Sequence, residues 1–162
     1  MLAAPAKIQA GAILARKEEI KEAISFYQEA QKLNPDIDLN PDTEEIDKDP
    51  KIVAHLLAAP AKIRQGMWLA KGGEIEEAIS FYQEAQKFNS DIDLNPDTEE
   101  IDKDPKIVAL QLAASPKIQA GEILARKGEI KEAISVYQEA QKLYPDIDLN
   151  PDTEEIDKDP KI

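Results

Sequence analysis

Apolar residues recur every three or four positions in the stretch EEIKEAISFYQEAQKL, which covers residues 18–33. They predict one stripe of a helix, made up of Ile20, Ala23, Ile24, Tyr27, Ala30 and Leu33. The preceding stretch AKIQAGAILARK has an apolar face of its own, formed by Ala10, Gly11, Leu14 and Ala15. Because only a short break separates the two stretches, we expect two antiparallel helices that pack against each other.

This pattern returns with a spacing of 55 residues. Residues 2–52 differ from residues 112–162 at only six of 51 positions. We therefore expect a single repeat domain over residues 1–162, with repeats at approximately 2–56, 57–111 and 112–162. Tandem repeats this similar are typical of solenoids, in which each repeat buries its apolar face on a neighbour. The predicted fold class is all-α, an α-solenoid of antiparallel helix hairpins.

Prolines indicate where helices begin, because proline costs little at the first helical position and about 3 kcal/mol inside a helix. The first helices of the three hairpins are predicted to start near Pro5, Pro60 and Pro116. Ser115 is the expected N-cap before Pro116. Asp49 and Pro50 predict a short extra helix between one hairpin and the next. The alternative is one longer helix that is kinked at the internal proline.

Small and bulky residues recur at fixed places in each repeat. They are Gly11, Leu14, Ala23, Tyr27, Ala30 and Pro35, then Gly66, Leu69, Ala78, Tyr82 and Ala85, then Gly121, Leu124, Ala133, Tyr137, Ala140 and Pro145. This pattern resembles a tetratricopeptide repeat (TPR) array, whose unit has about 34 residues. Lys7, Lys62 and Lys117 depart from it, because the family usually has a large aromatic residue there. The acidic remainder of each repeat is an insertion with no counterpart in the family pattern.

The resemblance implies a non-catalytic scaffold for protein–protein interaction, in which the first helices line a groove for a partner peptide. The groove positions that it implies here are Ile8, Ala12, Arg16, Ile63, Met67, Lys71, Ile118, Glu122 and Arg126. Arg16, Lys71 and Arg126 form a spaced basic row, which favours an acidic or carboxylate-bearing ligand. The same three residues would also suit solvated helix ends.

The segment DIDLNPDTEEIDKDPK is identical at 36–51, 91–106 and 146–161. It follows much of the spacing of a calcium-binding loop. The candidate metal ligands are Asp36, Asp38, Asn40, Glu44, Asp47, Asp91, Asp93, Asn95, Glu99, Asp102, Asp146, Asp148, Asn150, Glu154 and Asp157. Pro41 stands where that loop needs glycine, and Asp47 stands where it has a longer glutamate. Calcium is therefore the weaker alternative, and no cofactor is expected.

We interpret the acidic segment instead as a spacer that caps helices. Asn40 and Pro41 followed by acidic residues predict a helix start, because acids favour the positive end of a helix. Asp49 and Pro50 repeat the arrangement. Leu39 alternates with aspartates, so we expect an extended run that lays apolar side chains onto the helices.

Composition excludes several function classes. The chain has no cysteine and a single histidine, His55, so the usual nucleophilic and zinc-hydrolase sites are not available and we expect no enzyme. Its net charge is −13, and because the three acidic segments 36–49, 91–104 and 146–159 carry −18, the remainder carries +5. This balance argues against nucleic-acid partners. No apolar run approaches the length of about 20 residues that spans a bilayer, so we expect a cytoplasmic protein without a membrane partner.

A second hypothesis is head-to-tail self-association. The chain stops at Ile162, three residues short of completing the 55-residue register with Met1, so one copy could continue into the next. Such ends are also expected of an excised fragment or an engineered repeat protein, although substitutions such as Met67 and Trp68 resemble drift in a natural array. We expect Trp68 to fill the core or the groove.

Overall fold

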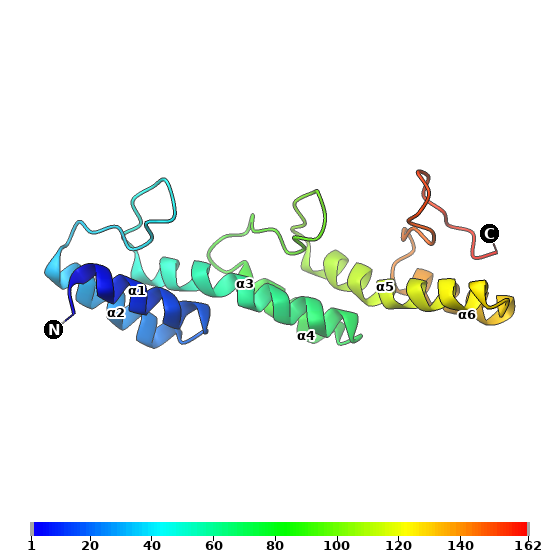
Figure 1. The fold of residues 1–162 in the computed structure, drawn as a ribbon, viewed down its shortest axis with the longest axis horizontal. Helices are drawn as coiled ribbons and strands as arrows, with labels where there is room; N and C mark the ends of the chain where they lie inside the picture. The colour runs from blue at the N-terminus through cyan, green and yellow to red at the C-terminus, as the bar shows by residue number, and fades with distance from the viewer. Residues whose placement is uncertain (1, 162) are drawn as a thin grey trace. The chain divides into compact units, whose positions relative to one another are not determined.

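The structure is a computed structural model that describes residues 2–161, and within this range it has helices and no strand. The helices are α1 (Ala4–Arg16), α2 (Ile20–Leu33), α3 (Pro50–Lys71), α4 (Ile75–Ala85), α5 (Pro105–Arg126) and α6 (Ile130–Leu143) (Figure 1). The chain divides into two compact units. One contains the residues up to Arg64 together with Tyr82–Ile92, and the other contains Gln65–Phe81 and the residues from Asp93 on. The prediction of an all-α fold is confirmed.

The first hairpin is held by the face of α2 that the periodicity predicted. Ala23, Tyr27 and Ala30 are fully buried, and they form one core with Ile8 and Ala15 of α1. Small residues on both helices let them approach closely. A Cβ atom on Gly11 would lie only 2.8 Å from the Tyr27 ring. In the third hairpin the same core forms around Tyr137, with Gly121 in the same relation to its ring.

The turn between the two helices of each hairpin needs a left-handed residue. Gly73 and Gly128 have φ angles of 85° and 81°, and Glu18 takes the same place in the first repeat with φ 65°. Glycine adopts this conformation without steric cost, whereas a side chain makes it unfavourable. The breaks predicted from Gly73, Gly128 and Glu18 are therefore confirmed.

The prolines at the middle of α3 and α5 do not start new helices. Pro60 and Pro116 lie inside continuous helices of 22 residues, so the predicted helix starts at these prolines are wrong and the alternative of one longer helix is closer. Ser115 does not cap Pro116, because its hydroxyl donates to the Gln111 carbonyl four residues earlier at 3.3 Å. In α3, burial on both sides of the proline offsets the loss of one helical hydrogen bond, since Ala59 and Ile63 are both buried.

The caps predicted at Asp49 and Asp104 are confirmed. The Asp104 side chain accepts hydrogen bonds from the backbone N–H groups of Lys106 and Ile107, at 2.9 and 3.1 Å. Asp49 makes the same pair of bonds at the start of α3. These bonds satisfy two of the four N–H groups that a helix start leaves without helical partners.

The lysines that replace the family's aromatic residue join the two helices of their hairpins by ion pairs. Lys7 pairs with Glu29, Lys62 with Glu84 at 2.8 Å, and Lys117 with Glu139 at 2.8 Å. The hydrogen bond and the charge of the lysine hold the pKa of Glu29 and Glu139 below its usual value. Charge pairing thus replaces part of the aromatic packing at these places.

Substitution Gly11→Ala should destabilise the first hairpin, because the added Cβ atom collides with the buried Tyr27 ring. We expect a loss of about 1–3 kcal/mol in the free energy of unfolding, the usual range for overpacking. Gly72→Ala is the matched control, since its nearest neighbour would lie at an ordinary 3.4 Å. Thermal melts that show equal stability for both variants would contradict this packing.

The lysine–glutamate pairs predict an acid-sensitive contribution to stability. The pKa of Glu29 and Glu139 is depressed in the folded state, so their contribution is present above the ordinary value of 4.5 and is lost as the pH falls below it. Unfolding by denaturant from pH 7 downward should therefore show a wild-type advantage over Lys7→Met, Lys117→Met that shrinks below pH 4.5.

The control for this titration is Lys21→Met, Lys131→Met, which removes the same charge from exposed positions of the second helices. Its difference from the wild type should change much less over the same pH range. A difference for Lys7→Met, Lys117→Met that stayed constant with pH would contradict the assignment.

Candidate protein-binding surface

Each acidic insertion is an ordered loop that follows the second helix of a hairpin. We call residues 34–49 the first acidic loop, residues 89–104 the second and residues 144–159 the third. In the first, the Leu39 N–H donates to the Asp47 carbonyl at 2.8 Å, and the Leu39 side chain is buried in the hairpin core. Leu94 and Leu149 make the same backbone bond and are buried in the same way. The predicted burial of Leu39 is confirmed.

Loop carboxylates bind the loop's own backbone. Asp38 Oδ1 accepts from the N–H groups of Asn40 and Asp47, both at 3.0 Å. The Thr43 hydroxyl lies 2.6 Å from the Asp47 carboxylate. The second and third loops repeat these bonds at Asp93 and Asp148. The loops are therefore closed by side-chain-to-backbone bonds between residues nine positions apart.

The helix start predicted at Asn40 and Pro41 is wrong. Residues 41–45 form turns and bends instead of a helix. The Thr43 hydroxyl donates to the Asn40 carbonyl at 3.1 Å and lies 3.0 Å from the Glu45 carbonyl. These bonds offer the backbone an alternative to a helical turn, which is why threonine and aspartate often favour turns over helices.

The calcium-pattern residues of the first loop have other partners in the structure. Asp36 pairs with Lys48 at 3.0 Å, Asp38 binds backbone N–H groups, and Asp47 accepts from Thr43. Glu44 is exposed. Across residues 2–161 no three aspartate, glutamate or histidine side chains come together as a group that could hold a metal ion. Calcium binding by these loops stays a prediction.

The groove positions of the first repeat lie together along one cleft. Ile8, Ala12 and Arg16 of α1 form one wall of a cleft of about 380 Å³, and the loop residues from Leu39 to Asp42 form the other. Arg16 lies 3.7 Å from the Asp42 carboxylate, with both side chains largely exposed. An exposed pair of this kind contributes little to stability. The loop, which the family pattern lacks, is therefore part of the surface that a ligand would meet.

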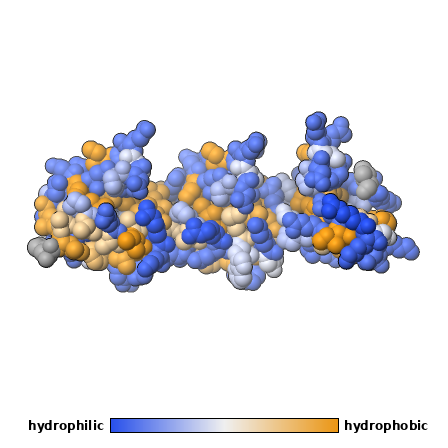
Figure 2. All heavy atoms as spheres, viewed as in Figure 1, coloured by the Kyte–Doolittle hydropathy of each residue, from blue (hydrophilic) through white to orange (hydrophobic). Residues whose placement is uncertain are grey.

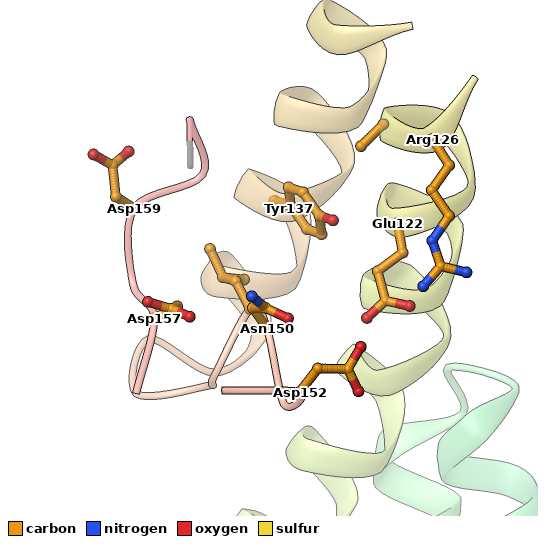
Figure 3. A pocket seen from close by; sticks show the side chains of 9 residues that line it. Glu122, Arg126, Tyr137, Asn150, Asp152, Asp157 and Asp159 are labelled. Carbon is orange, nitrogen blue, oxygen red and sulfur yellow. The ribbon is translucent and has the colours of Figure 1, made fainter. Parts of the chain in front are cut away.

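The groove positions of the third repeat line two adjoining cavities. Glu122 and Arg126 border the smaller, of about 190 Å³, together with Tyr137 and the loop residue Asp152. Figure 3 shows Asp152 directed from the loop toward α5, where Glu122 lies. Ile118 and Glu122 border the larger, of about 490 Å³. Glu122 and Asp152 belong to both linings, so the cavities meet there.

The groove positions of the second repeat fall in different compact units, with Ile63 in one and Met67 and Lys71 in the other. Ile63 is buried, Met67 is half-buried and Lys71 is exposed. The expectation for Trp68 is wrong, since 74% of its surface is exposed. His55 stacks on Phe88 with ring centroids 4.4 Å apart. Burial, and after it the charge of nearby lysines, lowers the pKa of His55.

The loop wall is the part of the surface that the sequence did not predict. Leu39, Asn40, Pro41 and Asp42 border the first cleft beside the helix positions. Figure 2 shows mostly hydrophilic side chains over the loops, which is also what a solvated spacer would show. The available signal was the identity of three loops over sixteen residues.

Comparison with known families agrees with these hairpins. A family model that describes the TPR domain of the IFT172 type matches residues 9–160. The chain belongs to this TPR family. No curated protein matches the sequence. Among the described residues of this TPR chain, no helix is both long and apolar enough to traverse a bilayer.

The closure of the first acidic loop can be tested by Asp38→Ala. This change leaves the N–H groups of Asn40 and Asp47 without their acceptor, so both amides should exchange with solvent about ten times faster or more, as expected for about 1–3 kcal/mol of lost stabilisation. Glu44→Ala is the control, because Glu44 is exposed and its side chain accepts no hydrogen bond in the described structure. Equal amide exchange rates in the two variants, measured by NMR, would contradict this role of Asp38.

Proposed function

We propose that the chain is a non-catalytic scaffold that holds an extended or helical segment of a partner protein against its first helices and acidic loops. Three repeats of 55 residues would present the same kind of surface in tandem. The observation that carries the proposal is the cleft beside α1, because Ile8, Ala12 and Arg16 line it together. These are the positions that the TPR resemblance implies for ligand contact.

The chemistry of this cleft suits a peptide better than a reaction. Its lining combines apolar side chains with one arginine and one aspartate. The cleft is open to solvent on one side, and its few polar groups would orient a ligand while the apolar wall supplies contact area. These features support binding by shape and apolar contact.

The basic row favours an acidic side chain in the ligand near the C-terminal ends of the first helices. Arg16, Lys71 and Arg126 are all exposed. Arg16 has Asp42 of the loop nearby, so a ligand carboxylate would compete with Asp42 for the guanidinium. Because the existing pair is exposed and long, such an exchange costs little.

Selection of peptides from a displayed random library against the wild-type chain tests the proposal. Peptides with acidic residues should lose about tenfold or more of their affinity for Arg16→Glu, Lys71→Glu, Arg126→Glu, because each reversal removes an attraction and adds a repulsion. Fluorescence anisotropy with the selected peptides measures the loss.

Lys21→Glu, Lys32→Glu, Lys131→Glu is the matched control, with the same change in net charge on exposed positions of the second helices. It should keep wild-type affinity. Equal affinities for both triple variants would defeat the basic row, whereas failure to select any peptide would defeat the scaffold itself.

A further inference from the structure

The larger cavity of the third repeat has a different character from the cleft of the first. It lies between the second acidic loop, α5 and the third acidic loop, and its volume is about 490 Å³. Leu112 and Ile118 of α5 give it an apolar floor, and Tyr144 and Ile147 of the third loop give it an apolar side. Gln111 and Gln119 add neutral polar groups.

The charge of this cavity is one-sided. Glu122, Asp146, Asp148 and Asp152 line it, and no lysine or arginine of the described chain does. Asp146 is paired with Lys158 at 2.8 Å, which leaves a surplus of three negative charges. Asp148 is held by backbone N–H groups of its own loop. Glu122 and Asp152 are the two carboxylates directed at each other where the cavities meet (Figure 3).

A buried and unpartnered acceptor also faces this cavity. Asn95 of the second acidic loop lines it and is only 6% exposed. Its Oδ1 atom is buried and accepts no hydrogen bond from any described residue. A buried carbonyl oxygen without a donor is unfavourable, so a ligand that brings an N–H group would gain from meeting it.

We propose that this cavity binds a cationic segment of a partner protein, in which an arginine or lysine lies between Glu122 and Asp152, an apolar side chain rests on Leu112 and Ile118, and an N–H group donates to Asn95. The proposal rests on the proposed scaffold function and names the chemistry of its ligand at one place. Arginine fits best, because its planar group can donate to two carboxylates and to an amide oxygen at once.

The change from the first repeat to the third supports a specific role for the floor. Glu122 occupies the place of Ala12, while the loop sequence that faces it is the same in both repeats. The first cleft has one arginine and one aspartate in its lining, so its charges balance. One substitution in the helix has therefore turned a neutral cleft into an acidic one.

The test uses three fluorescein-labelled octapeptides in which leucine alternates with arginine, glutamate or serine. We expect the arginine peptide to bind the full chain at low salt and the glutamate peptide to bind at least about tenfold more weakly at this site. Binding of the arginine peptide should weaken as salt is added, because the attracting charges are only partly buried. In NMR spectra of the labelled chain, it should shift the side-chain amide signals of Asn95 and Gln119.

Two variants separate this proposal from a nonspecific attraction to an acidic protein. Glu122→Gln, Asp152→Asn should weaken the arginine peptide by about fivefold to tenfold. Glu77→Gln, Glu132→Gln removes the same charge from exposed positions of α4 and α6 and should leave the affinity unchanged. Equal weakening by both pairs would overturn the site.

Asn95→Leu tests the unpartnered oxygen. The folded chain should keep its melting temperature or gain stability, because the buried Oδ1 has no hydrogen bond to lose, while the arginine peptide should bind about fivefold more weakly or less. Lower stability with unchanged affinity would show a purely structural role and overturn the contact. If library peptides bind but the arginine peptide does not, this inference fails alone. If no peptide of any charge binds, the scaffold function fails with it.

Discussion

The close approach of two helices over one aromatic ring is the constraint on which each hairpin depends. Tyr27 has no exposed surface, and its ring lies where any side chain on Gly11 would have to go. Its buried hydroxyl makes no hydrogen bond among the described residues, and burial raises the pKa of Tyr27 to about 12. The ring is thus retained for its volume and shape. This approach turns the other side of α1 outward, where Ile8, Ala12 and Arg16 meet the loop.

The acidic loops become walls because their carboxylates serve the backbone. Asp38 binds two N–H groups, Leu39 enters the core, and Gln31 of α2 donates to the Lys48 carbonyl at 2.6 Å near the far end of the loop. A cation that used Asp38 as a ligand would have to release both N–H groups. The outer acids such as Asp42 are free of this task and determine the charge that a ligand meets.

The hairpins could be predicted because the apolar period along α2 is strong and local. The continuity of α3 could not, because the rule for proline is local while the burial of Ala59 and Ile63 depends on tertiary packing. The loop failed for a related reason. Asn40 and Pro41 look like a helix start over four residues, but the bond from Asp38 to the Asp47 N–H spans nine. Trp68 has no partner in the sequence pattern that would indicate its exposure.

The repeats keep one wall constant and vary the floor. All three loops have the same sequence over sixteen residues, and all three are closed by the same aspartate and buried leucine. The helix positions that face them differ, with Ala12 in one repeat and Glu122 in another. Because a constant wall fixes the width of the cleft, a single helix substitution can change its charge without changing its shape. Specificity in this chain would then reside in the first helices, while the loops supply a rigid frame that accepts each change.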